Sequence, residues 1–252
     1  MNKQEVAPSN KLTCPQCGLS HIKRNGHTYY GKQNHRCLTC GRQFVIRQAT
    51  FDDQRRELIC RLLLERISLR GMCRVLDISL CWLMNFIGCL YRQVPDDLNF
   101  QMPDDADFQI LCLEADELWS FVGKKDNKRW IWLLIERTTY QVIAVQIGDR
   151  SEKSAVALWQ KVPLEVQKQA FVLTDRWDAY AAAIPAQQHT ACNKQSGQTA
   201  LIEGFNCALR QRVSRLVRKT VSFSKTDINH QGAIKYFLSN RNLERQKLCF
   251  SP

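Results

Sequence analysis

The stretch Gln109-Ile-Leu-Cys-Leu-Glu-Ala-Asp-Glu-Leu-Trp119 decides the fold of the larger part of this chain. Its first five residues, 109–113, form a largely apolar run that is typical of a buried strand and leads directly into acidic residues. Two further apolar runs, 129–135 and 141–147, follow after short polar connections. Three consecutive strands with short connections predict an antiparallel meander.

The elements that follow the meander indicate the sheet order. Residues 151–162 are predicted to form a capped helix, 170–173 a buried strand ending at Asp175, and a further helix starts near Trp177. Three strands, a helix, a strand and a helix form the opening of an RNase H-like core, in which the first and fourth strands lie side by side. We therefore expect a multidomain α/β protein whose RNase H-like domain, with basic C-terminal helices, occupies residues 109–252.

This strand order brings carboxylates together. Asp116, just past the end of the first predicted strand, and Asp175, at the end of the fourth, become neighbours and repel each other unless a cation lies between them. Glu203 lies on a predicted helix, 199–218, nearly opposite an apolar stripe, as does Arg210, with Asn206 beside them. Taken singly, each aspartate could be a strand-end cap and Glu203 a solvated surface residue. The stripe comprises Leu201, Phe205, Leu209, Val213 and Leu216.

The amino-acid composition limits the classes of partner that this chain can bind. The 252 residues carry 36 Lys+Arg against 24 Asp+Glu, a net charge of +12, and apolar residues make up 44%. Residues 1–93 hold 15 basic and 6 acidic side chains, and residues 199–252 hold 10 and 3. No apolar run approaches the roughly 18 residues of a membrane span, and the polar N-terminus lacks a secretory signal. A cytoplasmic protein that binds nucleic acid and no membrane is expected.

The acidic residues concentrate in one short segment. Residues 94–108 contain five Asp, two Pro and nothing basic. The segment has no apolar periodicity, and the change in pattern on either side favours an interdomain linker over the alternative, a solvated loop inside one domain.

Four of the twelve cysteines predict a metal site within residues 1–50. Cys14-Pro-Gln-Cys17-Gly and Cys37-Leu-Thr-Cys40-Gly are matched turns, each presenting two thiolates to one ion. Short alternating segments at 27–30 and 34–37 suit the hairpin of a zinc ribbon with structural Zn²⁺. The histidines that could compete as ligands are His21, His27 and His35.

Residues 51–93 change to a helical period. Ser68 and Ser79 can cap a short second and a longer third helix, separated by a tight turn at 77–79. This pattern predicts a DNA-binding helix-turn-helix, with Asn85 placed to read adenine and Arg92 to contact phosphate. A three-helix bundle used only for packing or dimerisation is the alternative.

Several blocks of sequence together resemble the insertion sequence one (IS1) transposase family, from Cys14 to about residue 240. They are Asp116-Glu-Leu-Trp-Ser-Phe-Val-Gly123, Thr174-Asp-Arg-Trp177 with Tyr180, Ile202-Glu-Gly-Phe-Asn206 with Leu209-Arg210, and Arg218-Lys-Thr-Val-Ser-Phe-Ser-Lys225. The resemblance implies that Asp116, Asp175 and Glu203 are a DDE triad. It implies divalent metal, Mg²⁺ or Mn²⁺, on these three carboxylates.

The resemblance also implies an activity. A member of the family is expected to bind the terminal inverted repeats of its element as double-stranded DNA, cleave their 3′ ends and transfer them to target DNA. Arg210, Arg218, Lys219 and Lys225 would neutralise phosphates. We expect at least a dimer on DNA, in the bacterial cytoplasm or nucleoid. A cleavage-only nuclease and a transposase-derived DNA-binding regulator are the alternatives.

Overall fold

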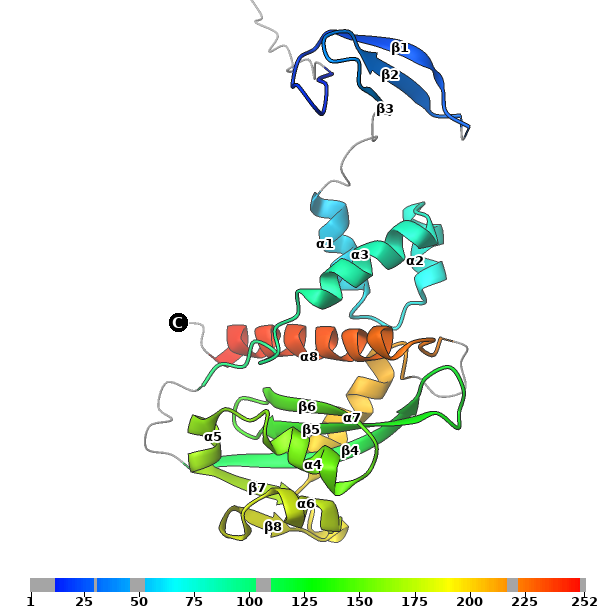
Figure 1. Cartoon of the computed structure of the whole chain (residues 1–252). Coiled ribbons are helices and arrows are strands. Elements are labelled where there is room, and N and C mark those ends of the chain that lie inside the picture. Colours follow the sequence, from blue (N-terminus) through cyan, green and yellow to red (C-terminus); the bar gives the residue numbers. More distant parts are fainter. Residues whose placement is uncertain (1–11, 30, 46–52, 103–109, 217–221, 250–252) are drawn as a thin grey trace, which may run out of the picture. The chain divides into compact units, whose positions relative to one another are not determined.

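The computed structural model describes residues 12–29, 31–45, 53–102, 110–216 and 222–249. The chain divides into two compact units, residues 1–57 and 58–252 (Figure 1). Within these residues no single helix has both the length and the apolar character to cross a membrane. The helices α2 (Leu69–Leu76) and α3 (Leu80–Arg92) pass that test only as a pair bent by 117°.

The first unit contains a small antiparallel sheet. Its strands are β1 (Ile22–His27), β2 (Gln33–Cys37) and β3 (Gln43–Val45), paired in the order β1-β2-β3. The predicted hairpin turns at Gly31, whose φ of 73° favours glycine.

The second unit begins with a helical segment. The three helices are α1 (Asp53–Leu62), whose second half belongs to this unit, α2 (Leu69–Leu76) and α3 (Leu80–Arg92). The hydroxyls of Ser68 and Ser79 accept hydrogen bonds from backbone N–H groups of the first turns of α2 and α3, as the sequence predicts for helix caps. The buried apolar side chains that the helices share are Ile59, Met72, Leu83 and Ile87.

A five-stranded sheet follows, in the order β6-β5-β4-β7-β8. The strands β4 (Leu111–Phe121), β5 (Lys128–Glu136) and β6 (Val142–Gly148) are antiparallel, while β7 (Ala170–Thr174) and β8 (His189–Ala191) run parallel to β4. The first and fourth strands of this sheet are therefore neighbours, which is the RNase H-like order. One expectation is wrong: β4 does not end before Asp116, because its pairing with β5 continues to Phe121 opposite Lys128.

Helices cover both faces of the sheet (Figure 1). One face packs against α4 (Glu152–Trp159), α5 (Leu164–Gln169) and α6 (Asp178–Ala183) around a core that includes Trp132 and Tyr180. The other packs against α7 (Ala200–Arg212) and α8 (Asp227–Cys249). Successive residues of β4 point to opposite faces, so odd-numbered Leu113 joins the first core and even-numbered Leu118 the second.

Helix α7 differs from the helix predicted at 199–218 in length and in rotation. It ends at Arg212, and the buried Val213 and Leu216 come after it. Its buried residues are Ile202, Asn206 and Leu209, while Leu201 and Phe205 of the predicted stripe are half-buried against the same core, so the face that meets the sheet is turned by about half a residue from that stripe. This rotation brings Asn206 over β4.

The helical segment is docked on α8, which lies between α3 and β6 (Figure 1). The two come close at Gly232 of α8, where an added Cβ would lie 2.3 Å from Cδ2 of Tyr91. The Tyr236 hydroxyl also donates to the Cys60 carbonyl at 3.2 Å. The helical segment and the α/β layers are thus packed as one body.

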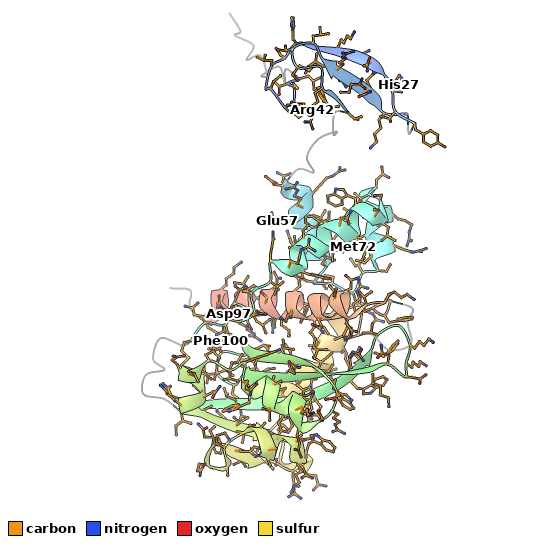
Figure 2. All side chains as sticks on the ribbon, viewed as in Figure 1. His27, Arg42, Glu57, Met72, Asp97 and Phe100 are labelled. Carbon is orange, nitrogen blue, oxygen red and sulfur yellow. The ribbon has the colours of Figure 1, made fainter. Side chains whose placement is uncertain are left out.

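The first part of the acidic segment is also packed on α8. Leu98 is fully buried, and Asn242 of α8 donates to its carbonyl at 3.0 Å. The Lys235 ammonium pairs with Asp96 at 2.8 Å. Figure 2 shows the side chains of this segment, with Asp97 and Phe100 labelled. Residues 94–102 are therefore fixed to the α/β core by buried contacts, and residues 103–108 lie outside the described residues.

One histidine of α8 is fully buried. His230 has no exposed surface, and neither of its ring nitrogens has a hydrogen-bond partner among the described residues. Burial lowers the pKa of His230 to about 4, opposed by the carboxylate of Asp227. The cations that lower it further are Arg129 and Arg215.

Candidate active site and metal centre

Three carboxylates meet where β4 and β7 lie side by side. One oxygen from each of Asp116, Glu117 and Asp175 lies within 4.8 Å of the others. Asp116 and Glu117 are in the middle of β4, and Asp175 directly follows the last residue of β7. The parallel pairing of these strands, with Glu114 opposite Leu173, brings the two predicted aspartates together.

Asp116 is held by helix α7. The Asn206 side-chain N–H donates to Asp116 Oδ2 at 2.7 Å. Burial, together with the neighbouring carboxylates, raises the pKa of Asp116 to about 6. A carboxylate in this position gains strongly from a nearby cation, because a positive charge offsets both the burial and the repulsion.

Glu117 is the member of the cluster that the sequence reasoning did not assign. Its Oε1 accepts hydrogen bonds from Arg150, at 2.8 Å from Nε, and its Oε2 accepts one from the Tyr180 hydroxyl at 2.9 Å. Burial raises the pKa of Glu117, and these two donors oppose the shift. The Arg150 guanidinium lies 4.6 Å from the ring centre of Trp130 and 4.0 Å from that of Trp177. Its place directly after Asp116 in a strand gave no signal for a shared cluster, because successive strand residues point to opposite faces.

Glu203 lies in the first turn of α7, exposed, and accepts a hydrogen bond from the Thr199 hydroxyl at 3.2 Å. It lines a pocket of about 250 Å³ together with all three clustered carboxylates, although it is not a member of the 4.8 Å group. The start of α7 is fixed by Glu114, which accepts a hydrogen bond from the Ile202 N–H at 2.9 Å and pairs with Arg137 at 3.0 Å. Glu114 has no exposed surface.

The donor set of the carboxylate cluster fits a divalent cation. Carboxylate oxygens are the ligands that Mg²⁺ and Mn²⁺ prefer, and opposite ligands of an octahedral Mg²⁺ site lie roughly 4.2 Å apart. Adjacent ligands lie roughly 3 Å apart, so three oxygens within 4.8 Å of one another could share one ion after drawing closer to it. Glu203 lines the same pocket.

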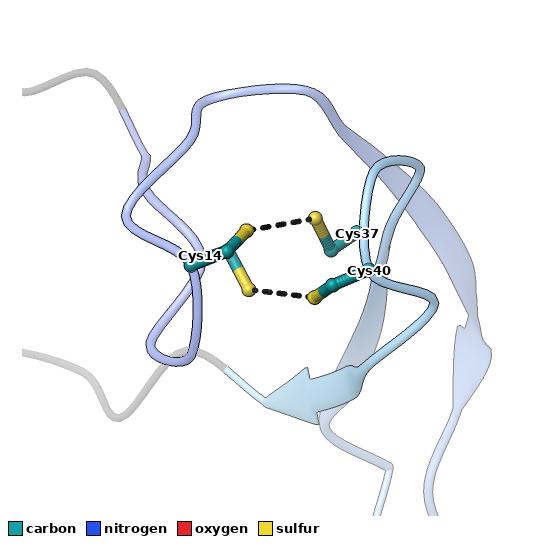
Figure 3. A group of neighbouring side chains, drawn as sticks. Cys14, Cys37 and Cys40 are labelled. Carbon is teal, nitrogen blue, oxygen red and sulfur yellow. Dashed lines mark hydrogen bonds between the residues drawn. The ribbon is translucent and has the colours of Figure 1, made fainter.

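The four predicted cysteines form a separate cluster in the first unit (Figure 3). All four sulfurs lie within 4.8 Å of one another, with 3.6 Å between Cys14 and Cys40 and between Cys17 and Cys37. In a tetrahedral zinc site with ~2.3 Å bonds, sulfurs are roughly 3.8 Å apart. Backbone N–H groups, of Cys40 first, lower the pKa of the Cys37 thiol to about 6, which favours the thiolate that a metal binds. The four thiols could hold a metal ion.

The predicted DNA-contacting residues are scattered over the second unit. Asn85 and Arg92 are exposed on α3, and Lys225 is exposed beside the Phe223 ring. Arg210 is on α7, and its guanidinium donates to the Trp119 carbonyl at 3.0 Å. Arg218 and Lys219 lie outside the described residues.

Comparisons with known proteins identify relatives of the α/β part. The family model "IS1 transposase" matches residues 109–244. The chain is similar to the insertion element IS1 4 protein InsB of Escherichia coli K12, 31% identical over 136 residues, which covers 54% of this chain and 78% of the relative. It is likewise similar to the iso-IS1n protein InsB of Shigella dysenteriae, 32% identical over 131 residues, covering 51% of this chain and 94% of the relative.

Two solved structures are more distantly similar. One is the HTLV-2 integrase catalytic core domain in complex with magnesium, at 10% identity and a TM-score of 0.33, covering 50% of this chain and 83% of that one. The other is the simian T-cell lymphotropic virus intasome in complex with a PP2A regulatory subunit, at 13% identity and a TM-score of 0.40. That match covers 78% of this chain and 74% of the other. The fold assignment rests on the strand order, and family membership rests on the sequence match. The chain belongs to the IS1 transposase family.

Proposed function

We propose that this chain is the transposase of an insertion sequence, which cuts its element's 3′ ends and joins them to target DNA. The observation that carries the proposal is the convergence of Asp116, Glu117 and Asp175 within 4.8 Å, in a pocket that Glu203 also lines. Such a cluster in an IS1-family chain suits metal-dependent phosphoryl transfer on DNA.

The proposed catalytic roles combine the family resemblance with the contacts. Asp116, Asp175 and Glu203 are the proposed DDE ligands of Mg²⁺ or Mn²⁺, which when bound would stabilise the attacking and leaving oxygens. Asn206 orients Asp116 through the 2.7 Å hydrogen bond, and Glu114 holds the helix that carries Glu203. No residue needs to form a covalent bond to DNA in this chemistry.

The test uses purified full-length chain, DNA carrying the ends of the flanking element, and Mg²⁺. We expect cleavage and joining, and the loss of both in Asp175→Asn and Glu203→Gln. Asp178→Asn is the matched control, because this exposed carboxylate is three residues from Asp175 and does not line the pocket. Calorimetric titration with Mn²⁺ without DNA should show weaker binding in Asp175→Asn and Glu203→Gln, and unchanged binding in Asp178→Asn.

Each alternative activity has its own outcome. Cleavage without joining would replace the transposase with a nuclease. End binding without cleavage, unchanged by Asp175→Asn, would indicate a DNA-binding regulator. Equal cleavage by wild type and Asp175→Asn would overturn the active-site assignment.

We propose that the N-terminal modules recognise the terminal repeats. Helices α2 and α3, bent by 117° with a three-residue turn, suit a helix-turn-helix. Asn85 and Arg92 on α3 are the proposed base and phosphate contacts, and the four-cysteine site would hold structural Zn²⁺. Asn85→Ala should relax sequence preference. Arg92→Ala should weaken binding to all sequences and reduce the salt slope by about 1. Equal preference in Asn85→Ala and wild type would exclude the base contact.

We propose that the active assembly on DNA is at least a dimer, because joining requires two element ends. Light scattering of the chain with and without end DNA tests this. A single protomer on paired, joined ends would contradict it.

A further inference from the structure

A second, larger cavity opens beside the carboxylate pocket. This cleft has a volume of about 680 Å³, within the roughly 300–1,000 Å³ range of small-ligand sites. At one end it includes Asp116, Glu117 and Glu203, so it is continuous with the proposed active site. The other lining residues that matter here are Arg66, Trp119, Trp130 and Arg210.

The aromatic part of the cleft comes from two neighbouring strands. Trp119 of β4 and Trp130 of β5 are directly opposed in the antiparallel register. Trp119 keeps 36% of its surface exposed, three residues along β4 from Asp116. A partly open indole beside an acidic centre offers a flat apolar face, and the flat ligands of such a face in a DNA-processing site are nucleobases.

The cationic part comes from two separate elements. The Arg210 guanidinium on α7 is fixed beside Trp119 by its 3.0 Å hydrogen bond to the Trp119 carbonyl. Arg66 is exposed in the connection between α1 and α2 and reaches the cleft because the helical segment is docked on α8. Guanidinium groups are the side chains best suited to phosphate.

We propose that this cleft binds an unpaired DNA nucleotide adjacent to the scissile bond. Its base stacks on Trp119, and its phosphates lie between Arg66 and Arg210. The nucleotide must be unpaired because a base in a duplex exposes only its edges and reaches an aromatic ring only after leaving the stack. The inference takes its substrate, DNA, from the proposed function and adds a site that reads the strand rather than cutting it.

The test measures binding without added Mg²⁺ or Mn²⁺ and without a chelator, so that no cleavage enters the result and the proposed zinc site is not stripped. Fluorescence anisotropy compares a blunt duplex of about 20 base pairs with the same duplex extended by a 3′ tail of about five unpaired nucleotides. Wild type should bind the tailed duplex more tightly. Trp119→Leu should lose about 5- to 150-fold of tailed-duplex affinity, the range for removing one stacking partner, whereas Trp119→Phe keeps most of it.

The cations are tested in the same assay. Arg66→Gln should weaken tailed-duplex binding and reduce its salt slope by about 0.7, the value for one phosphate of a single strand. The control is Lys168→Gln, because Lys168 is an exposed cation on α5 outside the cleft. This variant should change neither the affinity for the tailed duplex nor its salt slope. As a direct probe of stacking, a 5-iodouracil in the tail should photocrosslink to the peptide that contains Trp119.

The outcomes separate this inference from the proposed function. Equal affinity of wild type for tailed and blunt duplexes, or unchanged tailed binding in Trp119→Leu, would overturn the cleft assignment even if the chain transposes. A misfolded Trp119→Leu would lose blunt-duplex binding as well, and Trp119→Phe together with the crosslink then decides. Absence of cleavage by wild type in Mg²⁺ would refute the transposase proposal but leave the tail effect intact.

Discussion

The docking of the helical segment on α8 depends on the missing side chain of Gly232. A Cβ at this position would lie 2.3, 2.6 and 2.8 Å from Cδ2, Cγ and Cβ of Tyr91, distances that real Cβ atoms do not adopt. These atoms are the base of the Tyr91 side chain, which cannot swing aside without moving α3. Gly232→Ala is therefore expected to force the two helices apart.

The size of the effect follows from two opposing contributions. Alanine is favoured over glycine in a helix interior by about 1 kcal/mol. Overpacking of a tight contact costs about 1–3 kcal/mol, and three contacts below 3.0 Å place this site at the upper end. The net expectation is a destabilisation of about 2 kcal/mol, or a fall in Tm of about 4–8 °C for a unit of this size.

The assay is urea unfolding of full-length variants with Gly204→Ala as the matched control. Gly204 is an interior residue of α7 with nothing within 4 Å of its missing Cβ, so alanine should stabilise the protein by about 0.5–1 kcal/mol. In a double-mutant cycle, Tyr91→Ala should remove the penalty of Gly232→Ala. Stabilisation by both alanine substitutions would refute the predicted clash.

Three further predictions concern other buried or ligand-bearing groups. His230 has a pKa of about 4 in the folded protein against 6.5 in the unfolded chain, so its contribution to the free energy of unfolding is fully present above pH 6.5 and falls below it, by about 3 kcal/mol at pH 4. In urea unfolding, His230→Leu should therefore lose less stability than wild type between pH 7 and 5. Identical pH profiles of stability would contradict this. Cys37→Ser should contain less bound zinc than wild type by elemental analysis. Cys81→Ser, which replaces an exposed thiol on α3, should keep its zinc. Full zinc content in Cys37→Ser would exclude the four-thiolate site. Glu114→Leu removes the acceptor of the Ile202 N–H and should lower the free energy of unfolding in urea by about 1–3 kcal/mol. Glu114→Gln retains an acceptor and should lower it less. Equal stability of the two variants would argue against a stabilising hydrogen bond from the Ile202 N–H to Glu114.

The elements that the sequence predicted well are those with local signals. The strand order follows from apolar runs separated by short polar connections, and it brings Asp116 beside Asp175 as expected. The serine caps of α2 and α3 were predictable because a cap needs only its own first turn. The thiol cluster was predictable because each pair of cysteines sits in one turn.

The features that the sequence did not predict depend on distant contacts. Glu117 follows Asp116 in a strand, where successive side chains point to opposite faces, so a shared cluster was not an obvious expectation. Arg150 and Tyr180, which bind Glu117, are 33 and 63 residues away from it in the chain. The predicted stripe does pack against the core, and the small turn of α7 toward Ile202 and Asn206 was not predictable because Leu201 and Phe205 lie beside them on the helix. The buried Glu114 accepts a hydrogen bond from the Ile202 N–H and so fixes the start of α7 against β4.

Helix α8 links the stability of the docked segment to the proposed nucleotide site. The same docking that holds Tyr91 against Gly232 places Arg66 in the cleft with Trp119 and Arg210. If Gly232→Ala displaces α3, Arg66 should leave the cleft while Trp119 stays, because β4 does not depend on that contact. The variant should then reproduce the reduced salt slope of Arg66→Gln for tailed DNA and retain the iodouracil crosslink to Trp119. Adding Arg66→Gln to Gly232→Ala should change the salt slope no further, whereas a further fall of about 0.7 would show that Arg66 reaches phosphate without the docked arrangement.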